Sequence, residues 1–250
     1  MKYCLEVCVD SVRSAIAAEE GGADRIELCK SLVTGGISPG VTLLKQVKQY
    51  TGLPVRVLLR PRFGDFCYDS YELEEMKEDI VRYREAGADG IVTGLLTPEG
   101  ELDLPAMQDL IVAAEGLDVA LHRAFDMCRD PFETLEQAVS LGCKTILTSG
   151  QKASAWEGRE LLKKLVQQAD GRIEILAGAG ISPENIEKLA LEIRGSAYHM
   201  SGKTTEESRM KFRRNEVSMG LPGLSEYEIQ HTDAGKIRQA VLMLETLTFM

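Results

Sequence analysis

Short strand-like phrases recur along the whole chain, and their regular alternation with helical segments constrains the fold more than any other feature. Seven of the phrases are preceded by glycine and run into apolar residues, and the N-terminal "YCLEVCVD" adds an eighth. They occupy residues 3–10, 21–29, 52–61, 87–96, 116–126, 142–150, 171–180 and 195–202. Strict alternation of strand and helix predicts parallel strands joined by right-handed crossovers.

Eight such units in 250 residues match an α/β fold of one kind, the TIM-type (β/α)8 barrel. A doubly wound sheet is the alternative, but the units are evenly spaced and carry no clear nucleotide-binding fingerprint. No linker or low-complexity segment interrupts the series. We therefore expect a single barrel domain over residues 1–250.

Capping residues predict where several helices begin and end. Asp10, the pair Asp130–Pro131 and the pair Ser182–Pro183 are typical of a helix start. The glycines at 21–22 are typical of the end of the first helix.

Two connections, 60–70 and 203–232, are unusually long. Both follow strands, and in a barrel the segments that follow strands form the face that carries the functional site. The second connection is either a lid over that face or a charged, solvated excursion.

Composition excludes several classes of function. A formal net charge of -10 argues against binding to a nucleic-acid backbone, which needs a basic surface. No apolar run approaches the roughly 18 residues that cross a bilayer. The start "MKYCLEVCVD" lacks a signal-peptide pattern, so we expect a cytoplasmic protein with no membrane partner.

Polar side chains occupy alternate positions in the predicted strands. In "LEVCVD", for example, the aliphatic residues share one face and the polar residues share the other. Because the aliphatic face must pack against the helices, the polar face must point into the barrel. The residues predicted to point into the lumen or its mouth are Glu6, Cys8, Arg25, Glu27, Cys29, Arg60, His122, Arg123, Asp126, Ser149, His199 and Ser201.

This concentration of charge predicts acid–base chemistry on an anionic ligand. The candidate catalytic residues are Glu6, Glu27, Arg60, His122 and Asp126. Carboxylates and imidazoles transfer protons, and guanidinium groups hold anions. The alternative for the two glutamates is structural neutralisation by Arg25 and Arg60 or by a bound cation. The alternative for His122 is a satisfied core imidazole.

Glycine-containing loops follow the last two predicted strands, as "AGAGI" and "SGK". Loops at these two positions of a barrel frequently bind phosphate through backbone N–H groups. The candidate ligand-binding residues are Arg25, Gly178, Gly180, Ser201 and Gly202.

Six cysteines are spread along the chain without CxxC spacing. Two of them, Cys8 and Cys29, end neighbouring predicted strands with the same parity. Neighbouring strands lie roughly 4.8 Å apart, so the two sulfurs could share one soft ion, and thiolates select Cu(I). They could also form a labile disulfide or simply pack.

Long blocks of the sequence, from residue 6 to about residue 220, resemble a known family. The blocks are "EVCVDSVRSAIAAEEGGADRIELC", "RPRFGDF", "HRAFDM", "LTSG", "GAGI" and "MKFR" followed by "VSMG". They are similar to the CutC family of copper-homeostasis proteins. The resemblance implies a TIM-type barrel, a cytoplasmic location, a homo-oligomer, and Cu(I) as cofactor bound by cysteines of the first two strands. Those positions match Cys8 and Cys29.

Two functional hypotheses follow. The first is a copper-homeostasis protein that binds Cu(I) through Cys8 and Cys29. The second is an enzyme that acts on a small anionic or phosphorylated metabolite. A pure interaction scaffold would explain the fold but not the polar mouth.

Overall fold

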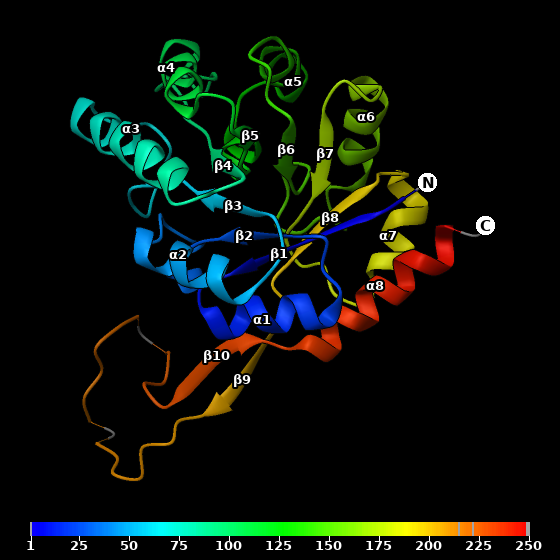
Figure 1. Cartoon of the computed structure of the whole chain (residues 1–250). Helices are drawn as coiled ribbons and strands as arrows, with labels where there is room; N and C mark the ends of the chain where they lie inside the picture. Colours follow the sequence, from blue (N-terminus) through cyan, green and yellow to red (C-terminus); the bar gives the residue numbers. More distant parts are fainter. Residues whose placement is uncertain (1, 215, 222, 249–250) are drawn as a thin grey trace.

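The computed structural model describes residues 2–214, 216–221 and 223–248, and it shows a closed barrel of parallel strands (Figure 1). The strands are β1 (Cys4–Val9), β2 (Arg25–Leu28), β3 (Val55–Leu58), β4 (Gly90–Thr93), β5 (Asp118–Leu121), β6 (Thr145–Thr148), β7 (Glu174–Ala177) and β8 (Ala197–Met200). They follow one another in sequence order, and β8 pairs with β1 to close the ring. The predicted TIM-type barrel is confirmed.

Helices surround the barrel, as Figure 1 shows. They are α1 (Val12–Gly21), α2 (Val41–Tyr50), α3 (Ser70–Glu85), α4 (Leu104–Ala114), α5 (Pro131–Ser140), α6 (Arg159–Ala169), α7 (Ile186–Ile193) and α8 (Ala234–Thr248). Two short 3₁₀ helices, η1 (Leu32–Thr34) and η2 (Arg123–Met127), follow β2 and β5.

Some predicted helix starts are confirmed and others are displaced. Asp130 caps α5, because its side chain accepts hydrogen bonds from two backbone N–H groups of the first turn. The cap of α1 is Ser11 rather than Asp10. The prediction that α7 starts at Ser182 is wrong: the Asn185 side chain bonds the Ser182 N–H and the Gly180 carbonyl. This bonding holds the intervening residues in a turn, so α7 begins only after Asn185.

The alternation of side chains along β1 confirms the predicted parity. Leu5, Val7 and Val9 are at most 1% exposed and belong to the main hydrophobic core between strands and helices. Glu6 and Cys8, on the other face, point into the lumen. Other buried apolar side chains form two small clusters apart from the main core: Cys29, Leu58, Val92 and Ala120, and Leu147, Leu176 and Ala197.

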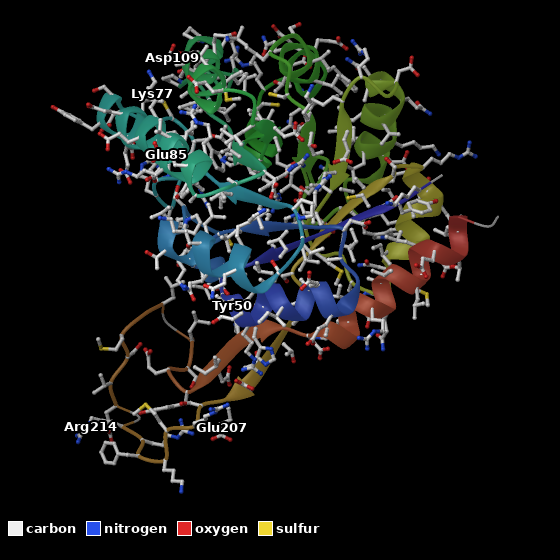
Figure 2. All side chains as sticks on the ribbon, in the orientation of Figure 1. Tyr50, Lys77, Glu85, Asp109, Glu207 and Arg214 are labelled. Atoms are coloured by element: carbon white, nitrogen blue, oxygen red, sulfur yellow. The ribbon has the colours of Figure 1, made fainter. Side chains whose placement is uncertain are left out.

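The long connection after β8 is an arm rather than a lid over the lumen. Its ends form an antiparallel pair, β9 (Lys203–Glu207) and β10 (Glu228–Thr232), which lies beside α1 and extends away from the barrel (Figure 1). Glu207 and Arg214 mark this arm in Figure 2. An ion pair between Arg13 and Glu206, with Nη2 and Oε2 2.9 Å apart, joins the arm to α1.

Within the part of the chain that the structure describes, no helix is both long and apolar enough to cross a membrane.

Candidate functional site

A layer of charged side chains crosses the lower part of the lumen, with Glu6 at its centre. The Glu6 carboxylate is 1% exposed and lies 2.6 Å from Arg25 Nε, 2.8 Å from His199 Nδ1 and 3.6 Å from Arg56 Nη1. Burial alone would raise the pKa of Glu6, but His199 and the two arginines lower it to about 2. Glu6 is therefore a fixed anion, neutralised by Arg25 as predicted and by Arg56 in place of Arg60.

Arg56 spans the lumen from β3 to β6. Its Nη1 donates to Thr145 Oγ1 at 3.0 Å. Gly90, its register partner on β4, leaves room for the side chain, because a Cβ there would lie 3.2 Å from Arg56 Cγ. Arg25 reaches the same layer and forms an ion pair with Glu174. The layer thus forms the floor of the site, and both arginines are compensated by carboxylates.

Above this floor, a cavity of about 610 Å³ opens at the carboxyl ends of the strands. Of the predicted site residues it brings together Cys8, Glu27, Cys29, Arg60, His122, Asp126, Gly180 and Ser201. Glu6 and Arg25 lie beneath the cavity in the charged layer. Lys203, at the root of the arm, is the one described arm residue that lines it.

The glycines Gly178 and Gly202 do not line the cavity. A Cβ on Gly178 would lie 2.6 Å from Leu147 Cδ1, and a Cβ on Gly202 would lie 2.4 Å from Ile237 Cδ1. Neighbouring side chains pack against the backbone at both positions and leave no room for a Cβ. Of the residues predicted to bind an anion in these two loops, only Gly180 and Ser201 line the cavity.

Three buried side chains, Cys8, Glu27 and His199, form a cluster at one wall of the cavity. One ligand atom from each lies within 4.8 Å of those from the other two. Strand register creates the cluster, because Cys8 is the partner of Glu27 across β1 and β2, and His199 stands beside Glu6 across β8 and β1. A thiol, an imidazole and a carboxylate in this arrangement can hold a metal ion or move a proton.

The protonation of this cluster is unusual. Burial raises the pKa of Glu27 to about 7, although the nearby His199 and Arg56 act in the opposite direction. Burial would lower the pKa of His199, but Cys8, Glu27 and Glu6 outweigh it and raise the pKa well above its ordinary value. Near neutral pH, Glu27 is poised to accept or release a proton beside an imidazolium.

Cys29 lines the same cavity but lies outside the cluster. Its side chain is fully buried in the lumen, and its Sγ lies 3.5 Å from the Val9 carbonyl oxygen. Burial raises the pKa of this thiol far above its ordinary value. Cys29 is therefore a protonated thiol next to the cluster.

Arg60 occupies another wall of the cavity. It is 8% exposed, and its guanidinium donates to the carbonyl oxygens of Gly36 at 3.0 Å and Gly64 at 2.8 Å. Its charged group also lies 5.0 Å from the ring centre of Phe66. Among the described residues, no carboxylate oxygen lies within 4.0 Å of it. Arg60 is a buried cation held by neutral groups.

His122 lies beside Arg60 and contacts the same ring, with 4.9 Å between the ring centres of Phe66 and His122. Its Nδ1 accepts a hydrogen bond from the Ala124 N–H at 3.1 Å, so Nε2 carries the ring hydrogen. Burial and the Arg60 charge lower the pKa of His122 to about 3. His122 is thus a neutral imidazole over the physiological range.

Asp126 has a positioning role in this structure. Its carboxylate accepts from Arg123 Nε at 2.7 Å, and from the backbone N–H groups of Ser149 at 3.0 Å and Gln151 at 3.1 Å. It also accepts from the hydroxyl groups of Thr148 and Ser149. With its oxygens committed in this way, Asp126 fixes Arg123 at the mouth and shapes the loop after β6.

Comparison with known proteins decides the family. Residues 3–204 match the family model described as the CutC family. The chain belongs to the CutC family. It is 46% identical to a family protein CutC from Histophilus somni, over 93% of this chain and 96% of that protein. It is 45% identical to the human copper homeostasis protein cutC homolog, over 94% of this chain and 87% of that protein.

Solved structures agree with this assignment. A CutC protein from Streptococcus agalactiae superposes with a TM-score of 0.77 at 33% identity, covering 80% of this chain and 98% of that one. A phosphoribosylanthranilate isomerase from Thermotoga maritima superposes with a TM-score of 0.57 at 13% identity, over 98% of this chain and 99% of that one. The second match shows the barrel fold alone.

Sequence reasoning did not place Arg56 or Phe66 in this CutC barrel's site. Arg56 carried a usable signal, since it lies between Val55 and Val57 with the parity of an inward residue and is the register partner of Glu27. Phe66 carried a weaker signal: it ends the block "RPRFGDF" in the long connection 60–70 after a strand, but an irregular loop has no parity from which its direction could be predicted.

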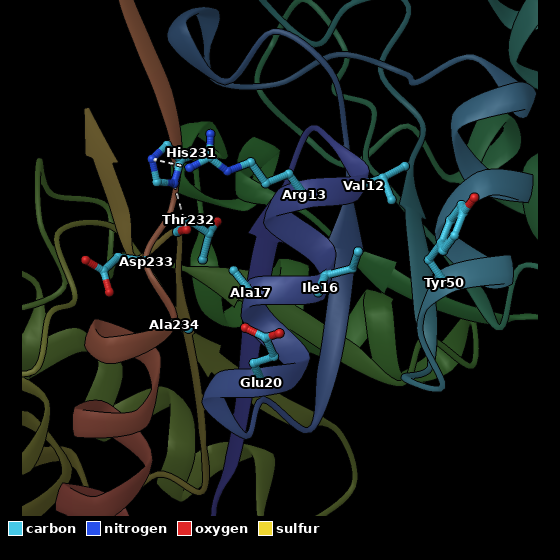
Figure 3. A pocket seen from close by; sticks show the side chains of 10 residues that line it. All are labelled: Val12, Arg13, Ile16, Ala17, Glu20, Tyr50, His231, Thr232, Asp233 and Ala234. Atoms are coloured by element: carbon cyan, nitrogen blue, oxygen red, sulfur yellow. Dashed lines mark hydrogen bonds between the residues drawn. The ribbon is translucent and has the colours of Figure 1, made fainter. Parts of the chain in front are cut away.

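A second hollow lies outside the barrel, between α1 and the start of α8 (Figure 3). Arg13, Glu20, Tyr50 and His231 are among the residues that line it. It contains none of the sequence-predicted catalytic, ligand or metal residues, so the cavity in the barrel mouth is the candidate functional site.

Proposed function

We propose that this protein binds Cu(I) in the barrel mouth through Cys8 and His199. The observation that carries the proposal is the cluster in which Cys8, Glu27 and His199 offer ligand atoms within 4.8 Å of one another. His199 is bonded to Glu6 through Nδ1, which leaves Nε2 for a metal. A carboxylate that orients a histidine ligand in this way is a common feature of metal sites.

The donor chemistry suits copper as a cargo ion. A thiolate is a soft ligand that selects Cu(I), and imidazole also suits copper. Cys29, on the neighbouring strand, would supply the second thiolate after it loses its proton. The names of the human and mouse relatives, copper homeostasis protein cutC homolog, support this proposal. A cytoplasmic location would keep both thiols reduced.

The test is a competitive Cu(I) titration of the reduced protein without oxygen. Parent protein should bind Cu(I) stoichiometrically. Cys8→Ser should abolish binding, and Cys29→Ser should weaken it. Cys143→Ser is the matched control, because Cys143 is a buried cysteine of the main core that does not line the cavity. If Cys8→Ser binds as tightly as the parent, the site assignment is wrong.

A second candidate function is acid–base catalysis on a small anionic metabolite. It is favoured by Glu27, whose pKa of about 7 suits proton transfer at neutral pH. The same cavity contains the uncompensated Arg60 as a partner for an anion.

Proton exchange distinguishes the two functions. A panel of small keto acids in D₂O, followed by NMR, should show exchange of the proton next to the carbonyl with parent protein and none with Glu27→Gln. The same variant should keep Cu(I), since a carboxylate is a hard ligand that Cu(I) does not need. Equal exchange by parent and Glu27→Gln would exclude Glu27 as the base.

A further inference from the structure

We propose that Arg60 and Arg123 form a binding subsite for the carboxylate of a small organic acid, in the same cavity as the Cys8 cluster. Carboxylate binding at this subsite does not depend on copper binding or on catalysis. If the second candidate function is correct, the subsite identifies its substrate class as small carboxylic acids.

The first argument is the missing counter-charge at Arg60. The other buried arginines of the lumen, Arg25 and Arg56, each lie within 4.0 Å of carboxylate oxygens. Arg60 is as buried as Arg56, but its described partners are the carbonyl groups of residues 34, 36 and 64. A buried charge without a counter-charge is costly unless a ligand completes it. An anion bound in the cavity would supply the missing charge.

The second argument is a pair of unused hydrogen-bond donors beside Phe66. Arg60 Nε and His122 Nε2 are buried and have no hydrogen-bond partner in the described structure; the Tyr68 hydroxyl, which interacts with Arg60, is a further unpaired group of the same loop but does not line the cavity. Nearly all buried polar groups in proteins are paired, so two orphans on neighbouring cavity residues indicate a ligand position. Phe66 is half-buried, lines the cavity and contacts both side chains. Movement of this ring is what would open the two donors to a ligand.

The third argument is the charge of the cavity as a whole. The chain has a formal net charge of -10, yet three of the five arginine, lysine and acidic residues that line the cavity are cations: Arg60, Arg123 and Lys203, against Glu27 and Asp126. Arg123 and Asp126 form an ion pair with each other, which leaves Arg60 and Lys203 against the single carboxyl group of Glu27. Concave surfaces of one charge attract ions of the other, so this cavity is a place where an otherwise acidic protein attracts anions.

The shape and donors favour a carboxylate over a phosphate. A carboxylate has two oxygens in one plane, which suits a small number of side-chain N–H groups. Backbone donors for a phosphate are fewer than the sequence predicts, because the Gly178 N–H donates to Thr148 at 3.0 Å and Gly178 does not line the cavity. Apolar walls from Leu32, Leu58 and Leu147 would contact a short hydrocarbon body.

The experiment uses metal-free parent protein and calorimetric titration with pyruvate, malonate and succinate, beside inorganic phosphate at equal ionic strength. At least one carboxylate should bind the metal-free parent, which separates this subsite from copper binding. Arg60→Met should weaken binding at least about tenfold, because it removes charge-assisted hydrogen bonds. The matched control is Arg129→Met, which removes the same charge from an exposed side chain outside the cavity and should bind like the parent.

Arg123→Gln keeps the test decisive if Arg60→Met does not fold, because the Arg123 side chain is 44% exposed and tolerates replacement. It should weaken carboxylate binding several-fold. The proposal is overturned if no carboxylate binds the parent, if phosphate alone binds, or if Arg60→Met and Arg123→Gln both bind like the parent.

Discussion

His199 Nδ1 lies 2.8 Å from Glu6 Oε1, and the two residues are register partners across the seam where β8 closes the barrel against β1. The same contact therefore belongs to the fold and to the site. It joins the last strand to the first, and it fixes the imidazole whose other nitrogen lies 3.7 Å from Glu27 Oε2. A change at Glu6 should disturb both stability and ligand binding.

Replacement of Glu6 by glutamine tests the stabilising part of this contact. Loss of the carboxylate leaves Arg25, Arg56 and His199 buried without their shared counter-charge. Breaking a buried ion pair from one side costs about 3–5 kcal/mol. Urea unfolding at pH 7 should show a loss of this size for Glu6→Gln, and little change for the surface variant Glu206→Gln.

The pH dependence of Glu6 has a defined sign. Its pKa is about 2 in the folded protein, below the ordinary value of 4.5. The stabilisation is therefore complete above pH 4.5 and is lost as the pH falls toward 2. An unfolding free energy that falls equally steeply in Glu6→Gln over this window would contradict the assignment.

If Cys8 and His199 bind Cu(I) as proposed, copper affinity should rise with pH more steeply in the parent than in His199→Gln. The pKa of His199 is raised well above its ordinary value, so a proton must leave before Nε2 can bind metal. Cu(I) competition assays between pH 6.5 and 8.5 should give a slope that is shallower by about one proton in His199→Gln. His231→Gln, on the arm, should keep the parent slope. Identical slopes in parent and His199→Gln would remove His199 from the ligand set.

His122 should make the protein less stable as the pH falls below neutral. Its pKa is about 3 in the folded protein, against 6.5 for an ordinary histidine. Below pH 6.5 His122 binds a proton in the unfolded chain but not in the folded protein. This group therefore lowers the unfolding free energy by about 1.4 kcal/mol for each unit by which the pH falls. The loss continues until the pH reaches about 3.

The measurement is urea unfolding of the parent and His122→Gln at pH 7, 6 and 5. Glu27 has a raised pKa and acts in the opposite direction over part of this range, but it is present in both proteins. The difference between the two slopes therefore isolates His122. Parallel slopes would mean that the pKa of His122 is not lowered in the folded protein, which would contradict the prediction.

The barrel was predictable because its signals are local. Alternation in β1 identifies Leu5 as a core residue and Glu6 as a lumen residue without any knowledge of the other strands. The height of each side chain in the barrel was not predictable in the same way. Arg56 is the register partner of Glu27, which lines the cavity, yet the Arg56 guanidinium reaches Glu6 in the floor layer. Which layer a long side chain joins depends on the stagger between strands, which is set only when the barrel closes.

Glycines and irregular segments limited the prediction of the site. "AGAGI" and "SGK" have the composition of an anion cradle, but Gly178 and Gly202 are required by the packing of Leu147 and Ile237. The arm beyond Lys203 carries no strong period, so neither its β9–β10 pair nor its position beside α1 followed from the sequence.

Gly94 is a glycine whose absent side chain makes room for the site. A Cβ at this position would lie 2.8 Å from His122 Nδ1, and equally close to Leu121 Cδ1. Gly94→Ala should therefore displace the imidazole, break its hydrogen bond to the Ala124 N–H, and destabilise the protein by about 1–3 kcal/mol through overpacking. Gly40→Ala is the control, because a Cβ there meets nothing within 4 Å and the backbone φ is -65°.

Three measurements check the effect of Gly94→Ala. Urea unfolding should show the loss of stability, and the histidine region of the NMR spectrum should show a shifted signal for His122 alone. Carboxylate binding should weaken with it, because His122 Nε2 is one of the two donors of the proposed subsite. If the variant keeps the His122 signal and the parent stability, the ring is not held where the structure places it, and the subsite beside Phe66 loses one of its walls.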